Sequence, residues 1–395
     1  MGNVIYLDHA GTTGVSEEVL KLMLPYFSEK FGNASSVHTV GQEAKFALDN
    51  AREMVASCLN SRVGDVIFTS GGTESDNAAL IGAAMALKET GNHIITSAVE
   101  HHAVLHACQY LENMGFQITY LPVDDAGKID LSQLSKAITG QTVLVSLMYA
   151  NNEIGTINPI AEISELVKKR ASEFQRTIVM HCDAVQAAGF LTLDTKALGV
   201  DMLSLSGHKF YGPKGTGILY LRRGTPFLPI LFGGSQERER RPGTENVAGA
   251  VGLSEALNIA DSSRVQTSNH CMLLRNTLIK EITEKIPGSV LNGSLENRLA
   301  NNVNFSFEGV QGESILLGLD MAEISASSGS ACSSGSLEPS HVLLALGQSS
   351  ELARGSLRMT LGKFNTESEI EYVLEVLPKL VQELRGLPTL SSSGI

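Results

Sequence analysis

Residues 206–215 read SGHKFYGPKG, and they directly follow the apolar run 201–205. This run predicts a buried strand, which the Gly-Pro turn chemistry after it would end. In an α/β sheet, side chains just beyond a strand's carboxyl end reach the crevice where ligands bind. Lys209 lies at such a strand end, where loss of hydration would lower the pKa of its amine and make it a nucleophile toward an aldehyde. A surface lysine at a strand end also fits this stretch.

Asp183 supplies the observation that favours the reactive lysine. The segment 177–182 (TIVMHC) predicts another buried strand, and Asp183 comes directly after it. The separation from Asp183 to Lys209 is about one βαβ step, so both side chains should emerge at the same edge of the sheet. A lysine and a carboxylate at one crevice are the pair that pyridoxal phosphate (PLP) needs. The lysine forms the Schiff base, and the aspartate keeps the pyridine nitrogen protonated so that the ring accepts electrons.

The composition limits the classes of protein to consider. At 395 residues, with 43% hydrophobic content, the chain can form two domains and bury a large core without a metal or disulfide. Its net charge of -12 argues against nucleic acid or an anionic membrane as the main partner. The five cysteines form no CxxC pair, which fits a reducing compartment, and no signal peptide or long apolar span is present. We therefore expect a cytoplasmic protein without a metal site.

Alternating strand and helix patterns predict the fold class. Strand-like runs lie at 66–70, 93–98, 117–123, 142–149, 177–182, 201–206 and 217–221, and helical patterns at 74–89, 103–114, 131–138 and 160–174. This alternation predicts an α/β fold with a mostly parallel seven-stranded sheet and helices on both faces. From about residue 247 the pattern changes to a long helix, a strand at 303–307, short helices and a final helix at 367–384. We expect these segments to form a smaller C-terminal α+β domain.

The predicted domain limits follow from these patterns. An N-terminal arm, 1–15, should contribute to the small domain, with the large domain at 16–255 and the small domain at 256–387. The final residues, 388–395, contain three consecutive serines and should be disordered.

A candidate phosphate site lies at 69–74 (TSGGTE), between a predicted strand and a predicted helix. Two glycines let the backbone approach an anion, and the free N–H groups of the first helical turn would point at it. Gly72 and Thr73 are the candidate ligands, although an ordinary helix capped by Thr73 is an equal alternative. The chain has neither a GxGxxG nor a Walker A pattern, which disfavours dinucleotide and P-loop sites.

His101 follows the predicted strand at 93–98. A histidine at this strand end could stack on a pyridine ring and move protons. A structural histidine is the alternative, which we accept for the adjacent His102. The run 181–183 (HCD) is a poor metal site, because successive side chains along a strand point to opposite faces.

Cys332 differs from the other cysteines in its surroundings. It lies in 325–336, where seven of the twelve residues are serine and two are glycine. Such a segment has little apolar area to bury, so it should be a mobile loop that can carry a thiol into a site and out again. A harmless exposed thiol is the alternative. The remaining cysteines are expected to be packing groups: Cys58, Cys108, Cys182 and Cys271.

The ordered motifs of the whole chain resemble the NifS/IscS-type cysteine desulfurases, which are fold-type-I PLP enzymes of the class V aminotransferase family. The resemblance covers nearly the full length. Two motifs, DHAGTT and DAVQ, differ by a residue or two from the usual family forms. The motifs are YLDHAGTT (6–13), FGNASSVH (31–38), FTSGGTESDN (68–77), EHHAV (100–104), ANNEIGT (150–156), HCDAVQ (181–186), SGHKFYGPKG (206–215), RPGTEN (241–246), SSGSACSSG (327–335) and SLRMTLG (356–362).

The resemblance implies a role for each matching residue. Lys209 resembles the Schiff-base lysine, Asp183 the pyridinium partner and His101 the ring-stacking acid/base. Cys332 resembles the nucleophile of the long-loop branch, and Arg358 the arginine that pairs with the substrate carboxylate. The other matches are Gln186 at the phenolic oxygen, Asn152 between cofactor and substrate, Thr73, Ser206 and His208 at the phosphate, and Thr244 reaching the phosphate from the second subunit of a homodimer.

The implied activity is conversion of L-cysteine to L-alanine, with the sulfur held as a persulfide on Cys332. A sulfur-acceptor protein such as an iron-sulfur scaffold would then receive it. A selenocysteine lyase remains an alternative, since 233–246 approaches that family's motif. A generic PLP-dependent aminotransferase would not need Cys332, and a non-catalytic scaffold would not need the combination of Lys209, Asp183 and His101.

Overall fold

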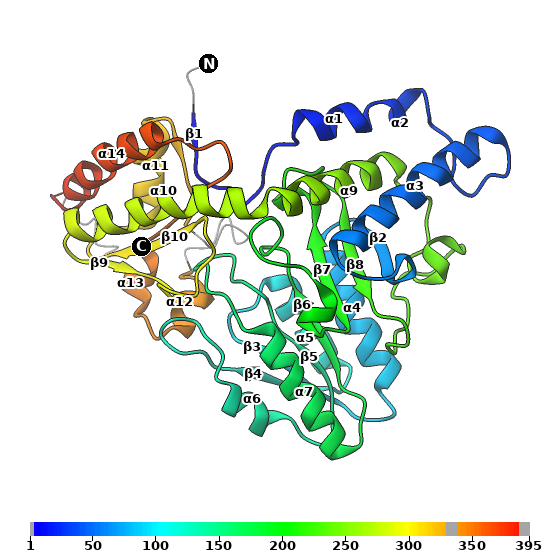
Figure 1. Ribbon diagram of the computed structural model, residues 1–395. Coiled ribbons are helices and arrows are strands. Elements are labelled where there is room, and N and C mark those ends of the chain that lie inside the picture. Colours follow the sequence, from blue (N-terminus) through cyan, green and yellow to red (C-terminus); the bar gives the residue numbers. More distant parts are fainter. Residues whose placement is uncertain (1–3, 329–337, 387–395) are drawn as a thin grey trace, which may run out of the picture.

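A seven-stranded sheet forms the centre of the part of the chain that this computed structural model describes, residues 4–328 and 338–386 (Figure 1). Its order is β2-β8-β7-β6-β5-β3-β4. All neighbouring strands run parallel except β8, which is antiparallel to both β2 and β7. The predicted mostly parallel sheet is therefore confirmed. The strands are β2 (Val66–Thr69), β3 (His93–Ser97), β4 (Gln117–Leu121), β5 (Thr142–Ser146), β6 (Val179–Asp183), β7 (Met202–Ser206) and β8 (Gly217–Leu221).

Some strand ends differ from the prediction for a local reason. β5 ends at Ser146, before the predicted limit at 149. The Met148 N–H donates to the buried carboxylate of Glu100 (3.1 Å) rather than to a neighbouring strand. β6 extends one residue further than predicted, so that Asp183 is its last residue.

Helices cover both faces of this sheet, as predicted. Side chains alternate along each strand, so that Val179 and Met202 pack under one set of helices, and Met180 and Leu203 under the other. The first set is α4 (Gly72–Leu87) and α5 (His102–Asn113). The second is α3 (Thr39–Cys58), α6 (Leu131–Ala137), α7 (Ile160–Phe174), α8 (Thr195–Leu198) and α9 (Val247–Ser262).

A second, antiparallel sheet of described strands lies beyond α9, in the order β12-β10-β9 (Figure 1). Its apolar face packs on helices around the stacked rings of Phe305 and Phe307. The predicted strand at 303–307 is β10 (Asn302–Phe307), and the final helix is α14 (Glu367–Gly386). The expected single long helix after 247 is two helices, since α9 ends and α10 begins on either side of Ser263. The other elements are α10 (Arg264–Lys285), β9 (Ser289–Leu291), α11 (Gly312–Met321), α12 (His341–Ala345), α13 (Ser350–Arg354) and β12 (Ser356–Thr360).

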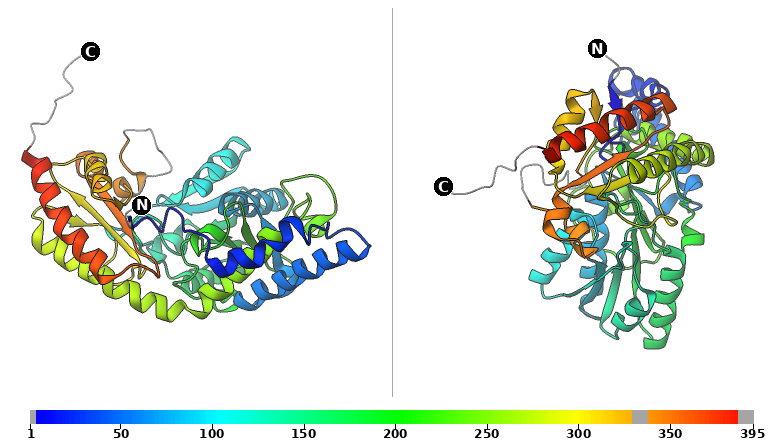
Figure 2. Two further views of the ribbon diagram at one scale, coloured as in Figure 1. Left: turned by 90° about the horizontal axis from the view of Figure 1, so that it is seen from above. Right: turned by 90° about the vertical axis from the view of Figure 1, so that its left-hand side faces the viewer.

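The N-terminal segment links the two sheets. β1 (Ile5–Tyr6) pairs in parallel with β11 (Ile324–Ser325) beside the second sheet. The chain then crosses toward the first sheet, where the Thr13 N–H donates to the carbonyl of His208 (2.9 Å). It continues into α1 (Glu17–Met23) and α2 (Pro25–Ser28), which lie alongside α9 (Figures 1 and 2). Residues 8–13 therefore run past the end of β7.

Across residues 4–328 and 338–386, no helix is both long and apolar enough to cross a membrane.

Replacing Phe305 by alanine should lower the free energy of unfolding by about 3–5 kcal/mol, because the ring is fully buried in the core of the second sheet. Thermal and urea denaturation would measure the loss. Phe364→Ala is the matched control, since that ring is 69% exposed and should change stability by under about 1 kcal/mol. Equal effects of the two substitutions would contradict this assignment of the core.

Candidate active site

A cavity of about 380 Å³ opens where β5, β6 and β7 end. All but two of the residues predicted from sequence for the site line this cavity. They are Gly72, Thr73, His101, Asn152, Asp183, Gln186, Ser206, His208, Lys209 and Arg358. The exceptions are Thr244, which lines a different cavity, and Cys332, which lies outside the described residues.

Lys209 reaches the cavity from a single 3₁₀ turn, Gly207–Lys209, that follows β7 directly. Its Nζ donates to the backbone carbonyls of Ala10 (2.6 Å) and Gly11 (2.8 Å) in the N-terminal segment. Gln186 Nε2 also donates to the Ala10 carbonyl (3.1 Å). Two backbone carbonyls of the N-terminal segment thus orient the amine of Lys209.

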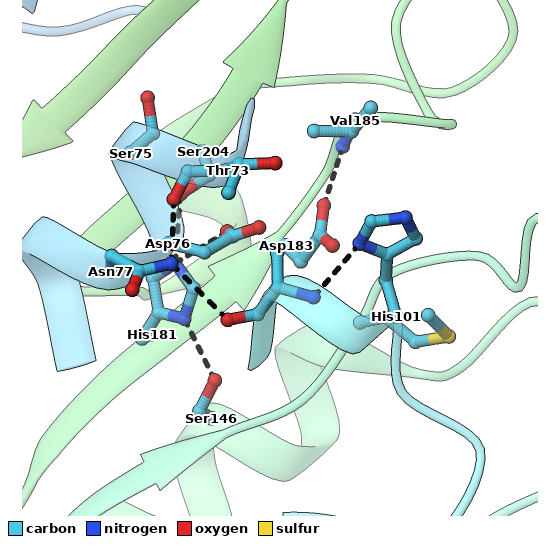
Figure 3. A network of polar contacts seen from close by, with 12 residues as sticks. Thr73, Ser75, Asp76, Asn77, His101, Ser146, His181, Asp183, Val185 and Ser204 are labelled. Atoms are coloured by element: carbon cyan, nitrogen blue, oxygen red, sulfur yellow. Dashed lines mark hydrogen bonds and ion pairs between the residues drawn. The ribbon is translucent and has the colours of Figure 1, made fainter. Parts of the chain in front are cut away.

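Asp183 places its carboxylate in the same cavity from the end of β6. It is 6% exposed, and its Oδ1 accepts a hydrogen bond from the Val185 N–H (2.9 Å; Figure 3). Burial raises the pKa of this carboxyl to about 6, while the Val185 N–H and the charge of Lys209 act in the opposite direction. The Val185 N–H and the charge of Lys209 thus favour the ionised form of Asp183, which can accept a hydrogen bond from a protonated ring nitrogen.

His101 is the N-cap of α5, and its Nδ1 accepts a hydrogen bond from the Ala103 N–H (3.1 Å; Figure 3). Burial, and then the charge of Lys209, lower the pKa of His101 to about 4, so the ring is neutral at pH 7. Because Nδ1 accepts, the proton of the neutral ring is on Nε2. His101 can therefore present an N–H to a ligand in the cavity.

The start of α4 forms a place for an anion. The helix begins at Gly72, and a Cβ there would lie only 2.8 Å from Val185 Cγ2, so glycine is required for the close packing. Ser206 and His208 line the cavity from the end of β7 and the turn after it. The free N–H groups of a helix start attract anions, and these hydroxyl and imidazole groups can add hydrogen bonds to a phosphate.

Arg358 projects from β12 and is 2% exposed. Its Nη2 pairs with Asp8 Oδ1 (2.7 Å), and its Nη1 donates to the Asn152 carbonyl (3.1 Å). Its Nε is buried and has no hydrogen-bond acceptor among the described residues. A guanidinium with an unused buried donor at a cavity is suited to a ligand carboxylate.

Sequence analysis missed several residues that line or shape this cavity. Three of them, Ala10, Gly11 and Asp76, line the cavity. The fourth, Asp8, pairs with Arg358, which lines it. Their motifs, at 6–13 and 68–77, were recognised as family-like, but no role followed from the residues themselves. Asp8 and Arg358 are 350 positions apart, so no local pattern could indicate their pairing.

Thr244 lines a separate cavity of about 210 Å³ together with Thr69 and Ser70. The nearby Arg241 pairs with Glu74 of α4, with Nε 2.8 Å from Oε1. The RPGTEN segment (241–246) is therefore tied to the start of α4, but Thr244 does not belong to the cavity of Lys209 in its own chain.

These residues fit PLP. The cavity combines an amine, an ionisable carboxyl, a neutral histidine and a helix start packed too closely for any residue but glycine at position 72. A mostly parallel sheet that presents this set at its carboxyl edge defines a fold-type-I PLP-dependent enzyme.

Comparisons with known proteins agree with this class. The model of the aminotransferase class-V family matches residues 5–373. Cysteine desulfurase IscS of Dictyoglomus turgidum is 50% identical over 387 residues, which cover 98% of this chain and 97% of that protein. Cysteine desulfurase IscS of Methanosarcina thermophila is 51% identical over 388 residues, with 98% and 94% covered. A solved structure described as a NifS-like protein has a TM-score of 0.90 and 37% identity, covering 96% of this chain and 100% of that chain. The chain belongs to the class-V aminotransferase family.

Replacing Lys209 by alanine should abolish the covalent attachment of PLP, because the amine in the cavity is removed. Borohydride reduction of the PLP-loaded protein, followed by peptide mass spectrometry, should find the cofactor on the Lys209 peptide of the native protein and on no peptide of Lys209→Ala. Lys214→Ala is the matched control, since this nearby lysine is exposed and does not line the cavity. PLP attached to Lys214 in the native protein would contradict the assignment.

Proposed function

We propose that this chain is a PLP-dependent cysteine desulfurase, which converts L-cysteine to L-alanine and passes the sulfur to an acceptor. The observation that supports this most strongly is the single cavity shared by Lys209, Asp183, His101 and Arg358. Relatives about half identical over nearly the full chain are cysteine desulfurases. Bound PLP would supply an electron-accepting ring that labilises bonds around the substrate's α-carbon.

The residues of the cavity have separate roles in binding and in proton transfer. Arg358 holds the substrate carboxylate, with Asn152 beside it. Asp183 would pair with the pyridine nitrogen of PLP, and Gln186 would donate to its phenolic oxygen. The phosphate would bind at the start of α4, with Thr73, Ser206 and His208 as ligands. With PLP bound, Lys209 would hold the cofactor covalently and would move the substrate's α-proton. His101 would stack on the ring and supply a proton from Nε2.

Cys332 is the proposed nucleophile toward the substrate sulfur. In the net step a bond forms between Cys332 Sγ and that sulfur, the Cβ–S bond of cysteine breaks, and the carbon takes up a proton to give alanine. The persulfide on Cys332 is then available to an acceptor.

The four other cysteines are poorly suited to this role. Burial raises the pKa of Cys58 to about 11, and those of Cys108 and Cys271 to about 12. Burial also raises the pKa of Cys182 well above the usual value. Since the thiolate is the attacking species, these groups are unreactive at neutral pH.

A homodimer is proposed because Thr244 lines a cavity other than that of Lys209 in its own chain. A second copy would supply it to the phosphate. Large apolar side chains are also exposed, with Phe31 at 71%, Val37 at 92% and Phe232 at 89%. Such exposure is typical of surfaces that pair with another chain.

We further propose an iron-sulfur scaffold as the acceptor and the cytoplasm as the location. The domain division at 1–15, 16–255, 256–387 and 388–395 is also a proposal. Its last segment and most of the Cys332 loop (325–336) lie outside the described residues.

Cys332→Ser should bind PLP and L-cysteine but form no persulfide. Mass spectrometry after brief exposure of the native holoenzyme to L-cysteine should find one extra sulfur on the Cys332 peptide. The Ser variant should carry no extra sulfur on any cysteine. Cys271→Ser, which removes a buried thiol, is the control and should behave as the native protein. An added sulfur on Cys58, Cys108, Cys182 or Cys271 would show that the nucleophile is misassigned.

Subunit exchange should reveal whether Thr244 acts across a dimer interface. Hybrids of a Lys209→Ala chain with a Thr244→Val chain would contain one doubly altered site and one intact site if Thr244 acts in trans. These hybrids should recover PLP affinity and turnover at about half the native number of sites. If each chain supplied its own Thr244, every site would carry one lesion, and no native site would appear.

A further inference from the structure

A row of polar side chains lies under α4 on a sheet face that is otherwise apolar. His181 and Asp183 of β6 point to this face together with Val179, and Ser204 of β7 is the registered neighbour of Asp183. His181 Nδ1 is 2.8 Å from Ser146 Oγ on β5, and its Nε2 is 3.0 Å from Ser204 Oγ. The network therefore spans three strands directly behind Asp183.

Asp76 enters this network from α4. It is 1% exposed and lines the same cavity as Asp183. Its Oδ1 lies 3.7 Å from His181 Nε2 and accepts no hydrogen bond within the described part of the chain. Figure 3 shows its carboxyl group between the His181–Ser204 contact and Asp183. None of the binding roles above uses Asp76.

The two neighbouring carboxyl groups differ in their surroundings. Asp183 has the Val185 N–H and the charge of Lys209, which both favour its ionised form. Burial raises the pKa of Asp76 well above its usual value, and the charge of Asp183 raises this pKa further. A hydrogen bond from Ser204 acts in the opposite direction. Burial also lowers the pKa of His181 to about 3, so this ring provides no cation for Asp76.

We propose that Asp76 is a positioning residue that remains protonated beside Asp183, so that the pair presents one negative charge, on Asp183, to the pyridine nitrogen. A neutral acid can join the hydrogen bonds of Ser204 and His181 without placing a second charge in a buried site, which would be costly. The part played by Asp183 in this inference rests on the proposed function. The protonation of Asp76 does not.

Infrared spectroscopy of the protein without PLP tests the protonation directly. At pH 7, aspartate labelled with ¹³C at its carboxyl group should show the carbonyl band of a protonated acid. Burial raises the pKa of Glu100 to about 8, so its protonated carboxyl would absorb near that of Asp76. The ¹³C label on aspartate separates the two bands. The band should disappear in Asp76→Asn and persist in Asp183→Asn. Loss of the band in Asp183→Asn alone, or its absence from the native protein as in an Asp76–His181 ion pair, would overturn the proposal.

PLP affinity of the reconstituted protein tests the positioning role. Asp76→Asn keeps a neutral hydrogen-bonding group, so its Kd should stay within about threefold of the native value. Asp76→Ala leaves the buried partners of Asp76 unsatisfied and should raise the Kd roughly tenfold. Asp183→Asn removes the charge itself and should raise it on the order of 100-fold. Circular dichroism of each variant would verify folding.

The outcomes distinguish failure of the role inferred for Asp76 from failure of the proposed function. If Asp76→Asn weakened PLP binding as much as Asp183→Asn, Asp76 would carry a functional charge and the inference would be wrong. Equal affinities for Asp76→Ala and Asp76→Asn would remove the positioning role. Unchanged affinity in Asp183→Asn would instead contradict the proposed function, while the infrared result would still decide the protonation of Asp76.

Discussion

The placement of Asp183 and Lys209 at the ends of two neighbouring parallel strands is the constraint on which the site depends. β6 and β7 pair in parallel register, so their carboxyl ends bring a carboxylate and an amine to one cavity. The antiparallel β8 then returns along β7, which leaves a short turn for Lys209 between them. Backbone carbonyls orient the amine, and a backbone N–H orients the carboxylate.

The N-terminal segment connects site residues from the two sheets. Ala10 and Gly11 accept hydrogen bonds from Lys209, while Asp8 pairs with Arg358 from the second sheet. The Ala10 N–H also donates to Thr360 Oγ1 (2.8 Å). The turn at residues 8–11 thereby fixes the lysine relative to the arginine. The separation of Lys209 and Arg358 matters because the substrate must reach the cofactor while Arg358 holds its carboxylate.

Sequence patterns predicted the parts of the site that follow apolar strands. Asp183, Lys209 and His101 each lie within three residues of the end of such a run, and parallel strands bring their carboxyl ends together. The Asp8–Arg358 contact could not be predicted, because it depends on the folding of two distant segments. β9 and β12 were missed as short strands of the second sheet, and the break at Ser263 carries no Pro or Gly signal. The surroundings of Asp76 also depend on α4 packing across three strands, which no single stretch encodes.

Product analysis of the purified PLP-loaded protein would test the central claim most directly. With L-cysteine and a thiol reductant, the account predicts L-alanine and sulfide in equal amounts, formed without any keto-acid acceptor. Parallel turnover of L-selenocysteine would show which of the two substrates is preferred. Transfer of the amino group to a keto acid, without release of alanine and sulfide from cysteine, would contradict the account and indicate an aminotransferase.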